Sequence, residues 1–255
     1  MHSLETEVIG QLSPHTPTLV FLHEGLGSVS GWRDFPQQVC EACGIAGILY
    51  SRTGYGQSPE FDGPLDLDFM HREASRDLPA IINHYGLEAP ILFGHSDGGS
   101  IALIHAAQFT DQPRAPLAVI VMAPHLFVEP VCIEAIAQLR QQFDTDDRLQ
   151  MSLSRYHHNP VTTFNTWTQA WLNPIFSAWD IREEASNICC PVLAIQGFDD
   201  QYGTMAQLDE LASRAPQVEL LKLTGCGHSP QRDQPTKVLH SVQAFVGAQL
   251  AAYLP

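Results

Sequence analysis

Basic side chains are scarce in this chain of 255 residues. Lysine and arginine together number 13 against 28 aspartates and glutamates, which gives a formal net charge of −15 at pH 7. Lys222 and Lys237 are the only lysines. An acidic surface repels both phosphate backbones and anionic lipids. The composition therefore argues against nucleic acid and against a membrane surface as partners.

Long apolar runs are missing as well. No segment approaches the roughly 18 consecutive apolar residues that a transmembrane helix needs. Residues 1–13 lack a basic start followed by an apolar run, so they do not resemble a signal peptide. We therefore expect a cytoplasmic protein that acts on a small molecule, and a homodimer is one assembly open to it.

Cysteine patterns that would bind a metal are also lacking. Cys40 and Cys43 have CxxC spacing, but they fall in a helical pattern and no second pair completes a zinc site. The histidines show no HxxxH or HExxH spacing. We expect reduced thiols, no metal site and no organic cofactor.

What the chain does contain is an alternation of short apolar runs with longer amphipathic ones. Hydrophobic residues make up 44% of the sequence, enough for one large core. Such an alternation predicts an α/β fold with a mainly parallel sheet flanked by helices. We expect strands at residues 18–22, 45–50, 90–93, 117–122, 192–196 and 218–223. We expect helices at residues 32–43, 69–85, 99–108, 205–214 and 234–253.

One stretch, residues 125–187, breaks the alternation. It has helical patterns and three of the four tryptophans, but no strand-like run. We expect residues 1–124 and 188–255 to form one core domain and residues 125–187 to form a helical cap insertion over one edge of the sheet. Crowded aromatic side chains in such an insertion favour a hydrophobic or aromatic substrate.

The strongest local signal is the sequence Gly94-His95-Ser96-Asp97-Gly98, which lies between an expected strand and an expected helix. A GxSxG sequence in that context is typical of a nucleophile elbow, a turn so tight that it needs glycine on both sides of the serine. The turn would lift the Ser96 hydroxyl above the sheet. It would also aim the backbone N–H of Asp97 at a developing oxyanion.

A serine hydroxyl needs a base to accept its proton. His228 follows the last expected strand, which would place it at the same edge of the sheet as Ser96. A carboxylate after the strand at 192–196 could orient the imidazole. Asp199 and Asp200 both fit the chain order serine, aspartate, histidine, so the residues alone leave the choice open.

This order of motifs resembles the α/β-hydrolase superfamily over almost the whole chain. The resemblance implies the α/β-hydrolase fold and places the acid three residues after Gly197, at Asp200. It also implies a second oxyanion donor in the loop at 23–27, where the family commonly has His-Gly-x-Gly. Matching the glycines assigns that role to Leu26, with Gly25 as the alternative.

The resemblance extends to an Arg-Gly-x-Gly-x-Ser signature, which the sequence at residues 51–58, Ser-Arg-Thr-Gly-Tyr-Gly-Gln-Ser, resembles. We expect Arg52 to be structural and to pair with Glu24, because both residues follow strand ends. His125 and Glu129 lie where the chain enters the insertion and could reach the pocket. Substrate contacts are expected from His125, Phe164, Trp167 and Trp171.

The side chain of Asp97 has two conceivable uses beside the catalytic cavity. The Ser-Asp-Gly-Gly sequence also resembles the valacyclovir-hydrolase-like branch, in which this aspartate is thought to recognise a substrate amine. It could instead hold the elbow rigid through backbone groups or an arginine. We favour the structural use, because a buried carboxylate without a protein partner is costly.

The expected activity is hydrolysis of a carboxylic ester with a hydrophobic or aromatic group, through an acyl-enzyme on Ser96. The partner is then a small-molecule ester. The resemblance also covers enol-lactonases and carbon–carbon bond hydrolases of aromatic catabolism, which stay as alternatives. A non-catalytic small-molecule-binding protein of the same fold is a third, although none of the three motif residues is lost.

Overall fold

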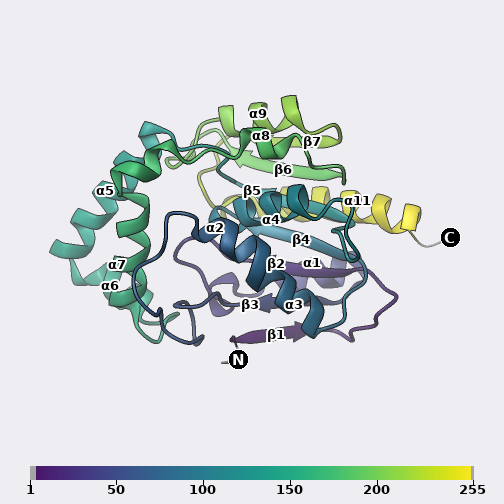
Figure 1. Ribbon diagram of the computed structural model, residues 1–255, viewed down its shortest axis with the longest axis horizontal. Coiled ribbons are helices and arrows are strands. Elements are labelled where there is room, and N and C mark those ends of the chain that lie inside the picture. Colours follow the sequence, from purple (N-terminus) through teal and green to yellow (C-terminus); the bar gives the residue numbers. More distant parts are fainter. Residues whose placement is uncertain (1–3, 254–255) are drawn as a thin grey trace.

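The strands of the computed structural model, which describes residues 4–253, form one twisted seven-stranded sheet (Figure 1). The strand order is β1-β3-β2-β4-β5-β6-β7. Only the pairing of β1 with β3 is antiparallel, and every other pairing is parallel. The strands are β1 (Thr6–Ile9), β2 (Thr18–Leu22), β3 (Gly47–Tyr50), β4 (Pro90–His95), β5 (Ala118–Met122), β6 (Val192–Gly197) and β7 (Val218–Leu223).

Burial explains which strands the sequence predicts. Every residue of β2, β3, β4, β5 and β6 is buried, as expected for strands that are covered on both faces, and these strands appear in the sequence as apolar runs. The sequence does not predict β1, because three of its four residues are exposed and it has no apolar run.

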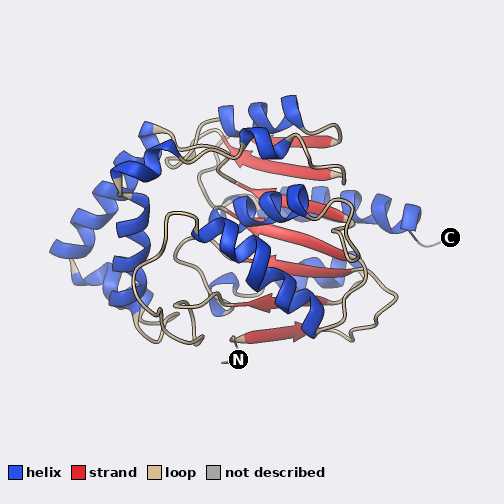
Figure 2. Ribbon diagram, in the orientation of Figure 1, coloured by secondary structure: helices blue, strands red, loops and turns tan. Residues whose placement is uncertain are grey.

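Helices cover both faces of the sheet (Figure 2). The hydrophobic core on one face includes α1 and α11, and the core on the other face includes α2, α3, α4 and α9. Within the described residues, no helix is both long and apolar enough to cross a lipid bilayer. The α-helices outside residues 125–187 are α1 (Phe35–Cys43), α2 (Phe69–Arg72), α3 (Leu78–His84), α4 (Asp97–Gln108), α9 (Ala206–Arg214), α10 (Pro230–Asp233) and α11 (Pro235–Tyr253).

The helix expected at 69–85 is interrupted. A π-helical turn at Glu73–Asp77 separates α2 from α3. Pro79, at the start of α3, has no N–H to donate to the preceding turn, which favours the interruption. His105 of α4 compensates, because its Nδ1–H donates to the carbonyl oxygen of Ala74 over 2.7 Å.

Further helices follow between β5 and β6, in residues 125–187, which we call the inserted segment. They are α5 (Pro130–Thr145), α6 (Asp147–Leu153), α7 (Pro160–Trp171) and α8 (Arg182–Ala185). Figure 2 shows α5, α6 and α7 beyond the carboxyl ends of the parallel strands. The two ends of the segment lie side by side, since Phe127 pairs with Asp180 in an antiparallel bridge and the Ile181 N–H donates to the Leu126 carbonyl over 2.7 Å.

Candidate active site

Ser96 occupies the turn between β4 and α4 in a strained backbone conformation. Its φ of 52° and ψ of −119° are rare for a residue with a side chain. Glycine is required on both sides. A Cβ at Gly94 would collide with the carbonyl of Gly98, and a Cβ at Gly98 would collide with the carbonyl of Leu22. The turn therefore holds the serine at the carboxyl edge of the sheet.

The structure brings Ser96, His228 and Asp200 together. His228 Nε2 lies 2.9 Å from Ser96 Oγ, and His228 Nδ1 lies 2.9 Å from both carboxylate oxygens of Asp200. Asp199 is exposed, and its backbone N–H donates to the Cys226 carbonyl. Of the two aspartates that the residues left open, Asp200 is the one in contact with the histidine.

Asp200 is held as a carboxylate. Burial acts to raise its pKa, but the hydrogen bond and charge of His228, together with the Tyr202 N–H at 2.8 Å, bring the pKa of Asp200 below its usual range. An ionised Asp200 accepts a hydrogen bond from the Nδ1–H of His228, which keeps the proton on Nδ1. Nε2 of the same ring is then free to accept the proton of the Ser96 hydroxyl.

Unused backbone N–H groups lie next to the serine. Asp97 is the first residue of α4, so its N–H has no acceptor within the helix. In the part of the chain that is described, no hydrogen bond uses the N–H of Asp97, Gly25 or Leu26. A Cβ at Gly25 would collide with the indole of Trp167, so glycine is needed there. Both residues considered for the second oxyanion donor therefore keep an N–H without a partner.

Two histidines that sequence reasoning missed hold this site in place. His95 Nε2–H donates to the carbonyl oxygen of His228 over 2.7 Å, which ties the elbow to the loop of the base. His157, from the inserted segment, donates from Nε2 to the Leu26 carbonyl over 3.0 Å and accepts at Nδ1 from the Gly56 N–H. Their sequence neighbourhoods give no signal for either contact, because both bonds span distant parts of the chain.

A cavity of about 110 Å³ lies beside Ser96 and His228. Glu24, Gly25, Leu26, Asp97 and Tyr202 form its wall on the side of the core. The inserted segment contributes His125, Cys132, Ile136, Leu139, Trp167 and Trp171.

Phe164, which the sequence placed among the substrate contacts, does not line this cavity. The ring is fully buried and stacks on Phe143, with centroids 3.8 Å apart. Phe164 and Trp167 are three residues apart on α7, yet only Trp167 lines the cavity. The aromatic content of the segment did not reveal which rings face inward.

The side chain of Asp97 is fully buried and has protein partners. Its Oδ2 accepts from Trp167 Nε1–H over 3.0 Å and lies 4.0 Å from Arg52 Nη2. Burial raises the pKa of Asp97, and the charge of Arg52 together with the nearby indole N–H groups of Trp167 and Trp171 opposes that shift. These contacts agree with the structural use of Asp97. Its other carboxylate oxygen, Oδ1, has no hydrogen-bond partner among the described residues.

Arg52 contacts Glu24, but it does so through the Glu24 backbone carbonyl and not through the expected ion pair with the carboxylate. Arg52 Nη2 donates to the backbone carbonyl of Glu24 over 2.9 Å, and its charge faces Asp97 instead. The Glu24 carboxylate lies 3.5 Å from His95 Nδ1 and 3.9 Å from Arg232 Nη2. Arg52 is buried beneath the loop, so it reaches the loop backbone rather than the side chain.

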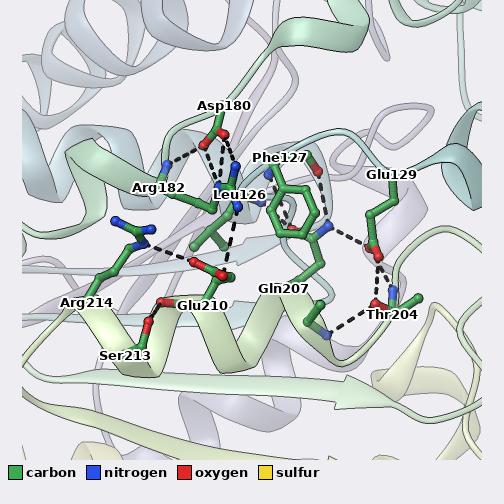
Figure 3. Close-up of polar contacts among 11 residues, drawn as sticks. Leu126, Phe127, Glu129, Asp180, Arg182, Thr204, Gln207, Glu210, Ser213 and Arg214 are labelled. Atoms are coloured by element: carbon green, nitrogen blue, oxygen red, sulfur yellow. Dashed lines mark hydrogen bonds and ion pairs between the residues drawn. The ribbon is translucent and has the colours of Figure 1, made fainter.

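Glu129 does not enter the cavity either. Its carboxylate accepts hydrogen bonds from the N–H and the hydroxyl of Thr204, at 2.9 and 2.6 Å, and from Gln207 Nε2 at 2.7 Å (Figure 3). Gln207, on α9, also accepts from the Leu126 N–H over 2.7 Å and donates to the Phe127 carbonyl over 3.1 Å. The first end of the inserted segment is thus fixed to α9.

The second end is fixed to the same helix. Arg182 pairs with Asp180 and approaches Glu210 of α9 at 3.9 Å, and Glu210 also pairs with Arg214 (Figure 3). The guanidinium of Arg182 lies over the Phe127 ring, 4.6 Å from its centroid. Both ends of the inserted segment therefore meet at α9.

His125 is the predicted substrate contact closest to the base. Its ring centroid lies 6.1 Å from that of His228 and 5.0 Å from that of Trp171. Burial lowers the pKa of His125 to about 3, so the ring is neutral at physiological pH. Among residues 4–253 there is no cluster of three or more histidine, cysteine or acidic side chains arranged to hold a metal ion.

Comparisons with known proteins agree with this architecture. Residues 19–241 match the alpha/beta hydrolase family. A bifunctional esterase/perhydrolase of Acinetobacter calcoaceticus is 23% identical over 214 residues, which cover 74% of this chain and 76% of that protein. A proline iminopeptidase of Lactobacillus helveticus is 22% identical over 261 residues, which cover 87% of this chain and 86% of that protein.

Solved structures show the same fold. The enol-lactonase from Burkholderia xenovorans LB400 superposes with a TM-score of 0.72 at 19% identity, covering 95% of this chain and 96% of that one. MGS-M2, an alpha/beta hydrolase enzyme from a deep-sea metagenome library, has a TM-score of 0.76 at 18% identity, covering 96% and 94%. The expected fold class is confirmed.

Proposed function

Because the chain belongs to the alpha/beta hydrolase family, we propose that it is a serine hydrolase that cleaves a carboxylic ester with a hydrophobic or aromatic group. The observation that carries the proposal is the continuous contact from Ser96 Oγ through His228 to Asp200, with 2.9 Å at each step. Ser96 is the nucleophile, His228 is the base, and Asp200 orients the imidazole.

The reaction proceeds in two halves. Ser96 Oγ attacks the acyl carbon while His228 Nε2 takes the hydroxyl proton, and the protonated His228 then gives this proton to the departing alcohol. Water attacks the resulting acyl-enzyme with His228 again as base, which releases the acid and restores the Ser96 hydroxyl. The proposal needs no metal or organic cofactor.

The N–H groups of Asp97 and Leu26 would hold the oxyanion that forms in each half. Neither group has another hydrogen-bond partner among the described residues, so each is free to bind the developing charge. The loss of one such donor typically costs about 3–4 kcal/mol of transition-state stabilisation. His157 fixes the carbonyl of Leu26 and thereby the loop that carries this donor.

We further propose that the inserted segment, residues 125–187, acts as a cap over the core domain formed by residues 1–124 and 188–255. Its residues His125, Trp167 and Trp171 line the cavity beside Ser96, and Ile136 and Leu139 of α5 add apolar lining. A cap in this position would exclude bulk water from the acyl-enzyme and shape the choice of substrate.

A fluorophosphonate probe tests the proposal, because it reacts quickly only with an activated serine. We expect labelling at Ser96, located by peptide mapping, and no labelling of the Ser96→Ala variant. A panel of p-nitrophenyl esters of graded acyl length, with a lactone added, then measures which bond is cleaved. A folded protein that neither reacts with the probe nor hydrolyses any member of the panel would instead be a binding protein.

A further inference from the structure

The cavity beside Ser96 contains polar atoms that the proposed hydrolysis does not use. Asp97 Oδ1, Trp171 Nε1 and His125 Nδ1 are buried, and none has a hydrogen-bond partner among residues 4–253. All three residues line the one cavity. Other buried polar atoms among the described residues also lack a partner, but these three border a single cavity, so a ligand in that cavity can pair with them.

The three side chains are fixed in place. Asp97 is held through its other oxygen by Trp167, and the ring of Trp171 packs edge-on against His125 and Phe176. The exposed fractions of Asp97, Trp171 and His125 are 0%, 1% and 2%. Their polar atoms therefore cannot turn toward solvent for a partner.

We propose that this cavity binds a hydroxyl group on the acyl part of the substrate, so that the ester hydrolysed is a hydroxyacyl ester. The inference rests on the proposed function, because it names the substrate class of that same site. The hydroxyl would donate its proton to Asp97 Oδ1 and accept from Trp171 Nε1–H. His125, whose neutral ring has one donor and one acceptor, completes the polar end of the cavity.

The charges around the cavity favour a hydroxyl over an ammonium group. Arg52, at 4.0 Å, already offsets the charge of Asp97, so an added cation would be a buried charge without a counterion. An ammonium group also has no lone pair to accept from Trp171. An anionic group fits less well, since Glu24 and Asp97 both line the cavity and none of its described lining residues is a lysine or arginine.

The size of the cavity favours a short acyl chain. Its volume of about 110 Å³ is smaller than a cavity of about 150 Å³ that accepts benzene, which leaves the hydrophobic or aromatic group of the proposed ester to its alcohol part. Ile136 and Leu139 of α5 also line the cavity and offer apolar contacts for the carbon chain. A hydroxyacyl group of about four carbons would match both the polar atoms and these apolar contacts.

Matched ethyl esters test the inference. Hydrolysis of ethyl butyrate, ethyl 2-hydroxybutyrate and ethyl 3-hydroxybutyrate is followed by pH-stat, and each kcat/KM is divided by the rate of alkaline hydrolysis of the same ester to remove intrinsic reactivity. We expect at least one hydroxy ester to exceed the butyrate by about 10- to 100-fold, because the butyrate leaves the polar atoms unpaired. Ethyl 3-aminobutyrate should not share this preference.

A pair of tryptophan variants locates the effect. Trp171→Phe keeps a ring against Phe176 but removes the indole N–H, and it should reduce the hydroxy-to-butyrate ratio about tenfold. Trp179→Phe is the matched control. Trp179 also packs against Phe176 with an unpaired indole N–H, but it does not line the cavity, so the ratio should not change.

The outcomes separate this inference from the proposed function. Labelling of Ser96 by the fluorophosphonate together with equal corrected rates for all three esters would overturn the hydroxyl site and leave the hydrolase intact. A preference for the amino ester, or a ratio lowered equally by both tryptophan variants, would also overturn it. Absence of labelling and of hydrolysis would instead count against the proposed function.

Discussion

The backbone of Ser96 shows how much the surrounding residues constrain a single position. Its left-handed φ of 52° persists because Gly94 and Gly98 let β4 and α4 approach closely enough to enclose it. The GxSxG sequence predicted this turn. The residues alone left Asp199 and Asp200 open, and the family resemblance favoured Asp200. Neither revealed the roles of His95 and His157, since these depend on contacts between distant segments.

Replacement of Ser96 should separate activity from stability. Ser96→Ala and Ser96→Gly should each lower ester hydrolysis by about 10⁴-fold or more, because the nucleophile is lost. Ser96→Gly should be more stable than Ser96→Ala by about 1 kcal/mol, since glycine adopts the left-handed conformation without strain. Urea unfolding of both variants measures the difference, and a more stable alanine variant would contradict the strain.

Replacement of the two adjacent aspartates should have unequal effects. Asp200→Asn should reduce kcat by about 10²-fold or more, because an amide does not hold His228 in the tautomer that serves as base. Asp199→Asn is the control and should stay within a few-fold of the unmodified protein, since its side chain is exposed. Steady-state kinetics on one ester decides, and a larger loss for Asp199→Asn would refute the assignment.

Among the secondary-structure elements, α9 contacts both ends of the inserted segment, a role that its sequence does not predict. It looks like an ordinary amphipathic helix, yet Gln207 is fully buried and contacts the first end of the inserted segment. Glu129, which the sequence suggested for the pocket, proves to be part of this attachment. Periodicity predicts which face of a helix is buried, but not which polar side chain on that face is needed by a distant segment.

Removal of this contact should weaken the fold. Gln207→Leu leaves the Leu126 N–H and the Phe127 carbonyl without their partner and removes one of the hydrogen bonds to the Glu129 carboxylate, which should cost about 3 kcal/mol of unfolding free energy. Gln243→Leu, on the exposed face of α11, is the matched control and should change stability by less than about 0.5 kcal/mol. Urea denaturation measures both, and equal effects would refute the role of Gln207.

The π-helical turn should give the protein a pH-dependent stability. Burial raises the pKa of Glu73 from 4.5 to about 7, and the nearby charge of Arg52 opposes that rise. A raised carboxyl pKa means that the folded state binds the proton more tightly than the unfolded state. Protonation of Glu73 therefore adds to the free energy of unfolding in full below pH 4.5, and this stabilisation is lost as pH rises through about 7.

Glu73→Gln removes this titration. The variant should gain stability relative to the unmodified protein between pH 5 and pH 8, by at most about 3 kcal/mol. Glu219→Gln, at an exposed position of β7, should show no such pH dependence. Urea unfolding at the two pH values gives the comparison, and a constant difference for Glu73→Gln would show that its carboxyl group is not buried in this way.

On the scale of the whole molecule, the sequence predicts the parallel sheet because buried strands must be apolar on both faces. It misses β1, whose side chains are mostly exposed, and it predicts one helix where Pro79 and the π-helical turn divide two. The scarcity of basic residues is likewise a property of the whole chain, and it predicts how the stability of the protein depends on salt.

Salt should stabilise this protein at neutral pH. A net charge of −15 causes self-repulsion in the compact state, and added ions screen it. Raising the NaCl concentration from about 10 to 150 mM at pH 7.5 should increase Tm by about 2–4 °C, equivalent to roughly 1 kcal/mol at this size. The effect should vanish near the isoelectric point of about 5.0. A Tm that falls with salt at pH 7.5 would show that attractive ion pairs dominate.

The bridge between Phe127 and Asp180 has a consequence for how such a protein can diversify. The chain leaves the core and returns to it at a single place, so everything between those two residues can be lengthened, shortened or exchanged without altering the span that the core must bridge. Ser96, His228 and Asp200, which we propose as nucleophile, base and acid, all lie outside that interval, whereas Trp167 and Trp171 lie within it. Exchange of the interval would change the lining of the cavity and retain the three residues of the proposed triad, provided that the new segment also supports the loop at Leu26, as His157 does here.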